Sequence, residues 1–122
     1  SEMCIRDSSH GPMEPWAEYD RYLADQFHYF LEKLSAKRER DERLIDDTVA
    51  LYGSGTSTTH NARNYPLVLA GGKNLGLKHG RFFKHKEERA LGDVYLTLLH
   101  QMDIPVKSFA ANDAEFSEIL QG

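Results

Sequence analysis

Two short apolar runs, each closed by glycine, constrain the fold of this chain more than any other feature. Residues 48–52 read TVALY and precede Gly53, and residues 66–70 read PLVLA and precede Gly71 and Gly72. Apolar runs of this length without polar alternation are typical of strands buried on both faces of a sheet. Because a long helical pattern comes before them, the sequence predicts the α/β class, as a partial sheet with flanking helices.

Two segments carry the three- and four-residue spacing of amphipathic helices. The first spans residues 15–34 and begins at Pro15, which suits the first helical position. Its apolar stripe consists of Trp16, Tyr19, Leu23, Phe27, Phe30, Leu31 and Leu34. The second spans residues 91–102 and ends before Pro105, which disfavours helical geometry at the preceding residue. Its stripe consists of Leu91, Val94, Tyr95, Leu98, Leu99 and Met102.

The segments between these elements give weaker patterns. Residues 37–43 are seven consecutive charged residues of mixed sign, which predicts a solvated connection. The pair His79 and Gly80 is typical of a tight hairpin turn with positive φ at the glycine. His100 lies opposite the apolar stripe of its helix, so we expect it to face solvent, and we expect His28, at the edge of its stripe, to be partly buried. Residues 110–122 contain too few apolar side chains to assign an element.

Composition excludes several classes of function. A length of 122 residues with 40% hydrophobic content is enough for one domain with a core. Fifteen basic against nineteen acidic residues give a net charge of −4, which argues against binding to nucleic acid or anionic lipid. No apolar run approaches the roughly 18–20 residues of a membrane span. Cys4 is the one cysteine, so no internal disulfide is expected.

The first eight residues, SEMCIRDS, resemble a translated library adapter. They have no helical or strand periodicity and no apolar core of a signal peptide. We therefore expect residues 1–8 to be non-native and the native sequence, residues 9–122, to begin inside a longer protein.

The best candidate for a functional site is the polar loop of residues 53–64, which reads GSGTSTTHNARN. In open α/β sheets, ligands bind beyond the carboxyl ends of strands, and this loop follows a predicted strand. Its glycines free the backbone to approach a ligand, and His60 can coordinate a metal or transfer a proton. The alternative is an ordinary polar connection in which His60 has no role. The loop lacks the Gly-x-Ser-x-Gly frame of a nucleophile elbow.

A second cluster combines cations with aromatic rings. It consists of Lys73, Lys78, Arg81, Lys84 and Lys86 with Phe82 and Phe83. Such a cluster can hold a phosphate or sulfate group, although a solvated hairpin has the same alternating pattern. The glycine-rich run before it lacks the Gly-Lys-Ser/Thr ending of a phosphate-binding loop. No His, Cys or Asp spacing is diagnostic of zinc.

Several segments, in order, resemble the carboxyl-terminal part of the HXXSHH family, also described as domain of unknown function 1552, which occurs in secreted bacterial proteins. They read DRYLADQFHYFLEKL, LYGSG, THN, PLVLAGG, GLKHGR and LTLL, within residues 9–109. The family is itself similar to the alkaline phosphatase and sulfatase superfamily. The resemblance implies that this chain is the carboxyl-terminal fragment of a larger alkaline-phosphatase-like domain, with its nucleophile and most metal ligands in the missing upstream part of the same chain.

The same resemblance implies a function for the complete protein: an extracytoplasmic, metal-dependent hydrolase of phosphate or sulfate esters. It implies a divalent metal of the zinc or calcium class and an anionic small-molecule or polymer substrate. The implied metal-site residues are His60, Asn61 and His10. The implied substrate-binding residues are Ser54, Thr56, Thr59, Asn64, Lys78 and Arg81. The alternative is a non-catalytic extracytoplasmic binding or structural protein. Under either hypothesis we expect the chain alone to be inactive. Because it supplies few elements to cover its apolar strands, we also expect it to expose apolar surface or self-associate.

Overall fold

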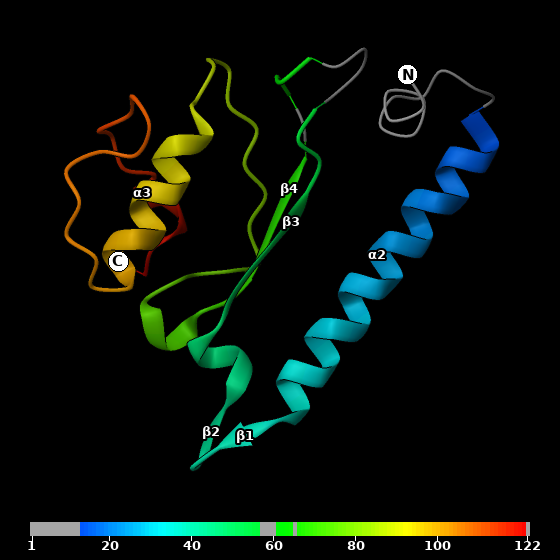
Figure 1. Ribbon diagram of the computed structural model, residues 1–122, viewed down its shortest axis with the longest axis horizontal. Coiled ribbons are helices and arrows are strands. Elements are labelled where there is room, and N and C mark those ends of the chain that lie inside the picture. Colours follow the sequence, from blue (N-terminus) through cyan, green and yellow to red (C-terminus); the bar gives the residue numbers. More distant parts are fainter. Residues whose placement is uncertain (1–12, 57–60, 65, 122) are drawn as a thin grey trace.

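The computed structural model describes residues 13–56, 61–64 and 66–121. This part of the chain contains two α-helices, α2 (Met13–Ala36) and α3 (Leu91–Gln101), and two small antiparallel sheets of two strands each. Figure 1 shows α2 and the longer strand pair diverging from a shared lower end, with α3 on the far side of the strands. The prediction of a mixed helix-and-strand fold with flanking helices is confirmed at this level.

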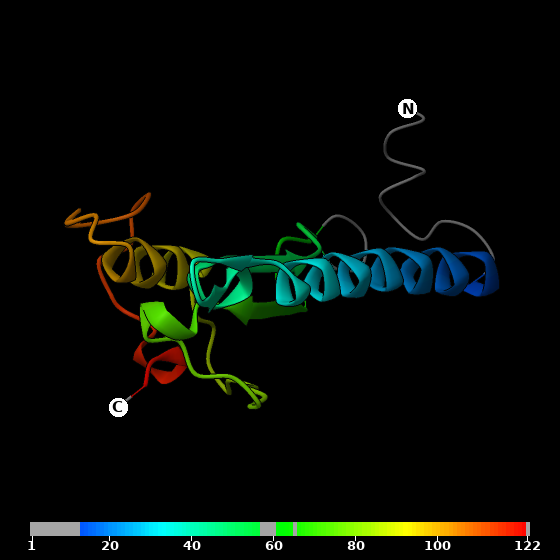
Figure 2. The same cartoon turned by 90° about the horizontal axis from the view of Figure 1, so that it is seen from below.

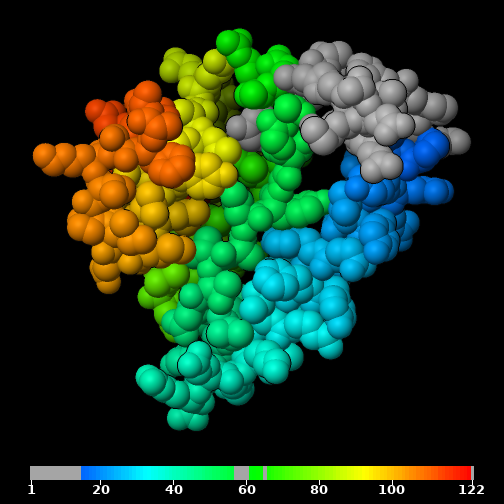
Figure 3. Space-filling model, viewed as in Figure 1, coloured from blue at the N-terminus to red at the C-terminus, as the bar shows by residue number. Residues whose placement is uncertain are grey.

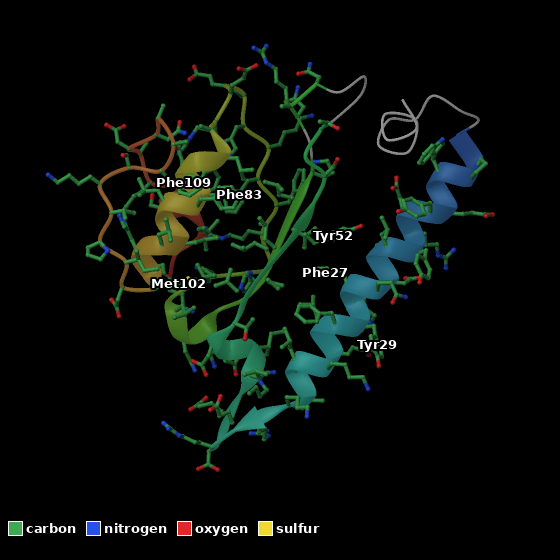
Figure 4. The ribbon with its side chains drawn as sticks, viewed as in Figure 1. Phe27, Tyr29, Tyr52, Phe83, Met102 and Phe109 are labelled. Atoms are coloured by element: carbon green, nitrogen blue, oxygen red, sulfur yellow. The ribbon has the colours of Figure 1, made fainter. Side chains whose placement is uncertain are left out.

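Helix α2 matches the predicted helix with two extra residues at each end. Its half-buried apolar side chains are Trp16, Leu23, Phe27, Leu31 and Leu34. The Phe27 ring stacks on the ring of Tyr52, with 4.9 Å between the ring centres, and Figure 4 shows the two side chains pointing toward each other. Tyr19 and Phe30 belong to the predicted apolar stripe but are about half exposed, so the prediction that they are buried was wrong. The prediction that His28 is partly buried was also wrong, because its side chain is 73% exposed beside Glu32.

The charged run after α2 forms a small hairpin. Strand β1 (Arg38–Glu39) pairs with β2 (Glu42–Arg43), and Arg40 between them has a positive φ of 55°. All of these residues are exposed, so the predicted solvation is confirmed, while the pairing was not predicted. The 3₁₀ turn η1 (Leu44–Asp47) follows and leads into the longer strand pair.

The longer pair consists of β3 (Val49–Gly53) and β4 (Leu67–Gly71), which run antiparallel. Their register sets Gly53 against Leu67 at one end and Val49 against Gly71 at the other. Both strands were predicted, but burial on both faces was wrong, because Leu67 is 38% and Val68 is 48% exposed. Neither strand of this pair has a third strand beside it in the described part of the chain, so the expected exposure of apolar surface is present.

The main core lies between α3 and the carboxyl-terminal segment. Helix α3 confirms the second predicted helix, and its buried Leu98 packs with Leu77, Phe116 and Ile119. Ile119 belongs to the 3₁₀ turn η4 (Ser117–Ile119), and Leu77 forms an isolated antiparallel bridge with Leu120. Figure 2 shows η4, in red, beside the 3₁₀ turn η3 (Lys73–Leu75), in green. The tail that sequence patterns left unassigned thus completes the core.

Residues 77–85 do not form the predicted hairpin. Gly80 has the expected positive φ of 80°, but in the described residues the segments before and after it do not pair with each other. The segment instead packs through Phe83, whose ring meets the edge of Phe116 at 5.9 Å between ring centres. Contact with the carboxyl-terminal segment therefore replaces pairing of the two predicted hairpin arms.

The His100 side chain is 29% exposed, so it faces solvent only in part, and its ring makes two contacts that were not predicted. Its Nδ1 lies 2.6 Å from Oε1 of Glu115, and its Nε2 lies 2.7 Å from the carbonyl oxygen of Val106. Both partners are acceptors, so both ring nitrogens must donate, which only the protonated imidazolium can do. His100 therefore connects α3 to two points of the following loop when it carries a proton.

This arrangement predicts a pH-dependent contribution to stability. The hydrogen bond to Val106, followed by the one to Glu115, raises the pKa of His100 above 6.5. A raised pKa in the folded state means that the stabilisation is fully present below about pH 6.5 and is lost as pH rises through the folded-state pKa. We expect the His100→Gln variant to lose this pH dependence of the free energy of unfolding, measured by urea titration between pH 5 and 9. The exposed His28→Gln is the control, and parallel pH profiles for wild type and His100→Gln would refute the role.

Candidate functional site

The predicted functional loop joins β3 to β4. Because these strands are antiparallel, the loop connects two paired neighbours and does not lead from a parallel strand into a helix. The rule that places ligands at the carboxyl edge of a parallel sheet therefore does not apply to this pair by itself. The loop is a polar connection at the end of the strand pair where Gly53 faces Leu67, and its described residues make specific contacts.

On the β3 side of the loop, Ser54 and Thr56 form a tight local turn. The Ser54 hydroxyl donates to the carbonyl oxygen of Thr56 at 2.6 Å and accepts the backbone N–H of Thr56 at 3.2 Å. The Thr56 hydroxyl oxygen is buried and has no hydrogen-bond partner in the part of the chain that the structure describes. Ser54 thus stabilises the loop backbone. The Thr56 hydroxyl makes no hydrogen bond to the described residues.

On the β4 side, an exposed ion pair links the loop to a distant segment. Arg63 Nη1 lies 3.2 Å from Oε1 of Glu88, shortly before α3. Asn64 adopts a left-handed backbone with φ of 52°, which asparagine tolerates better than most residues. Asn61 and Asn64 are both exposed. The described residues on this side of the loop are therefore open to solvent.

The implied metal site is only partly within the described residues. His10 and His60 lie outside them, as does Thr59, which is an implied substrate-binding residue. Among residues 13–56, 61–64 and 66–121, no group of three or more His, Cys, Asp or Glu side chains could hold a metal ion. Asn61 offers an amide oxygen, which suits a hard cation such as calcium, but a structural or catalytic site needs further ligands. The described residues therefore do not make up a metal site by themselves.

Lys78 and Arg81, two implied substrate-binding residues, do not join this loop. Lys78 lines a groove with Gly71, which is the end of β4 opposite to the loop. Arg81 Nη2 donates to the carbonyl oxygen of Glu118, and its guanidinium lies 5.2 Å from the centre of the Phe83 ring. The structure thus separates the implied substrate-binding residues into a loop group and a group beside the carboxyl-terminal segment.

The groove beside Lys78 has a volume of about 600 Å³. Its polar lining includes Arg43, Asp46, Lys73, Lys78, His79 and Gln121. Arg43 and Asp46 were not predicted as site residues, because Arg43 belongs to a charged run interpreted as solvated. Their three-residue spacing is the signal that could have paired them, since it places two side chains on one face of a helical turn.

No family model, curated protein or solved structure matches this chain. The resemblance to the HXXSHH family and to the alkaline phosphatase and sulfatase superfamily therefore stays a prediction. Neither helix in the described residues is both long and apolar enough to cross a membrane.

Proposed function

We propose that this chain is the carboxyl-terminal part of a larger extracytoplasmic domain of the HXXSHH type. The complete protein, on this proposal, is a metal-dependent hydrolase of phosphate or sulfate esters. The observation that carries the proposal is the polar loop between β3 and β4, which has a tight turn at Ser54 on one side and an exposed ion pair of Arg63 with Glu88 on the other. The turn at Ser54 restricts the loop backbone, which helps to hold a ligand-binding side chain in a reproducible position.

Exposed apolar side chains support the part of the proposal that concerns a larger domain. Leu67 and Val68 of β4 are 38% and 48% exposed, and neighbouring Leu69 is only half-buried. Apolar strands of this kind are usually covered by further elements of the same domain. Figure 3 shows α2 along one flank and the carboxyl-terminal half along the other, with the strand region between them.

In this proposal His60 is a metal ligand, and its neighbours orient the ester group. Asn61 and Asn64 offer amide donors and acceptors for that purpose. The divalent metal, when bound, supplies a Lewis acid for the ester oxygen. The remaining ligands come from the upstream part of the chain, and the buried Thr56 hydroxyl is a further donor at this end of the strands.

The test uses the complete protein, purified without chelator. We expect about one equivalent of bound metal and hydrolysis of a generic phosphate or sulfate ester, because a working site should be nearly full. His60→Ala should lose both the metal and the hydrolysis, while the control His28→Ala, exposed on α2, should retain both. Less than about 0.1 equivalent of metal, together with an unchanged His60→Ala variant, would overturn the proposal.

One observation favours a second candidate, a non-catalytic binding or structural protein. Ser54 and Arg63, two of the loop's polar side chains, already serve internal contacts. If the loop is only a connection, loop variants should leave every binding property of the complete protein unchanged, and no ester should be hydrolysed.

A further inference from the structure

The groove beside Lys78 carries more positive than negative charge in a chain whose net charge is −4. Its charged lining consists of Arg43, Lys73 and Lys78 against the single carboxylate of Asp46. This local excess of cations is opposite in sign to the whole chain, so it is not a consequence of overall composition. It creates a local field that favours an anion.

Asp46 offsets only one of the three cations; Arg43 is its hydrogen-bond partner, and the charge of Lys73 also acts on it. Arg43 Nε and Nη2 donate to Oδ2 and Oδ1 of Asp46 at 2.9 and 2.8 Å. This hydrogen-bonded contact is the main reason that the pKa of the buried Asp46 lies below its usual value, so the carboxylate stays ionised and held by Arg43. Within residues 13–56, 61–64 and 66–121, no ion pair includes Lys73 or Lys78.

The backbone that carries these side chains is held in place. The backbone N–H of Lys78 donates to the carbonyl oxygen of Ile119 at 2.8 Å, and Gln121 Nε2 donates to that of Leu77 at 2.9 Å. His79 Nε2 donates to the carbonyl oxygen of Gly71, which fixes the proton on that nitrogen. A site formed on a fixed backbone loses less entropy when a ligand binds.

We propose that this groove binds a tetrahedral oxyanion, either a phosphate or a sulfate group, through the ammonium groups of Lys73 and Lys78. Lysine ammonium groups act as compact positive charges for such oxygens, and the paired Arg43 adds to the field. The proposal does not depend on the proposed hydrolase function, because the groove lies at the Gly71 end of the strand pair and the loop lies at the Gly53 end.

The test is a titration of the ¹⁵N-labelled 122-residue chain with inorganic phosphate and, separately, with glycerol phosphate, at low salt where screening is weakest. We expect saturable amide shifts centred on Gly71, Lys73, Lys78 and His79. The double variant Lys73→Gln/Lys78→Gln should weaken the affinity at least about tenfold, because it removes two charge-assisted contacts. Tighter binding of the monoester would identify an esterified group as the ligand, and tighter binding of inorganic phosphate would identify the free ion.

The matched control is Lys84→Gln/Lys86→Gln, which removes the same charge from a nearby segment outside the groove. We expect it to change the affinity by less than about twofold, since only long-range attraction is altered. The absence of saturable shifts, shifts centred elsewhere, or equal weakening by both double variants would overturn the proposal. Far-UV circular dichroism of each variant confirms that the fold is retained. Metal content and ester hydrolysis of His60→Ala are separate readouts, so the two proposals can fail independently.

Discussion

Replacing Gly71 with alanine should lower the free energy of unfolding by at least about 3 kcal/mol. Gly71 ends β4 with φ of 78°, in the left-handed region that a β-carbon disfavours. A β-carbon built there would lie 2.1 Å from the carbonyl oxygen of Thr48 and 2.7 Å from that of Ile45. Both contacts involve backbone atoms, so η1 and the residue that joins it to β3 would have to move to relieve them.

Gly80→Ala is the matched control for this prediction. Gly80 has nearly the same φ, 80°, but a β-carbon there would meet nothing within 4 Å. Gly80→Ala should lower the free energy of unfolding by only about 1–2 kcal/mol, because only the left-handed backbone is unfavourable. Urea unfolding of the 122-residue chain, followed by far-UV circular dichroism, measures both variants. Equal losses for the two would show that the close approach at Gly71 has no effect on stability.

The sequence predicted Gly71 only as the end of a strand and gave no sign of its close contact with the backbone of Thr48 and Ile45. The same division between local and long-range features holds for the rest of the fold. Local patterns were sufficient for both helices and for the approximate extent of β3 and β4, because three- and four-residue spacing and short apolar runs are local properties. The antiparallel pairing of β3 with β4 was not predicted, because an apolar run does not specify the direction of its neighbour.

Long-range contacts account for the errors. The hydrophobic wheel assigned Tyr19 and Phe30 to a buried stripe, but the described chain has no element that covers them. Phe116 and Ile119 reach the core although their segment has no regular periodicity. His100 was expected in solvent because its two acceptors, at Val106 and Glu115, lie in a loop whose path the sequence does not reveal.

For the candidate sites, too, local features could be predicted from the sequence and long-range contacts could not. The polar loop and Lys78 could be selected from composition, since glycine, hydroxyl, amide and lysine side chains are visible in the sequence. That Lys78 shares a groove with Arg43 and Asp46, and not with the loop, depends on contacts between segments more than thirty positions apart in the chain. Chemistry was thus predictable by residue type, while the grouping of residues into sites required the structure.

Replacing Leu77 with alanine is the second change from which we expect a large loss of stability, about 2–5 kcal/mol. Leu77 is 1% exposed and packs with Leu98, Phe116 and Ile119. Removing its side chain leaves a cavity where α3, η4 and the strand pair meet, and the penalty combines lost burial with lost contacts around the cavity. The backbone contacts of Leu77 with Gly72 and Gln121 do not involve its side chain and are expected to persist.

Leu67→Ala is the matched control, because it removes the same atoms from a leucine on β4 that is 38% exposed. Partial exposure reduces both the burial lost and the cavity formed, so we expect a cost of about 1 kcal/mol or less. Urea unfolding should show a lower midpoint for Leu77→Ala with an unchanged dependence on urea concentration, which separates lost stability from a change in the surface exposed on unfolding. If the two variants lost equal stability, the packing of α3 against the carboxyl-terminal segment would not be the main core of this chain.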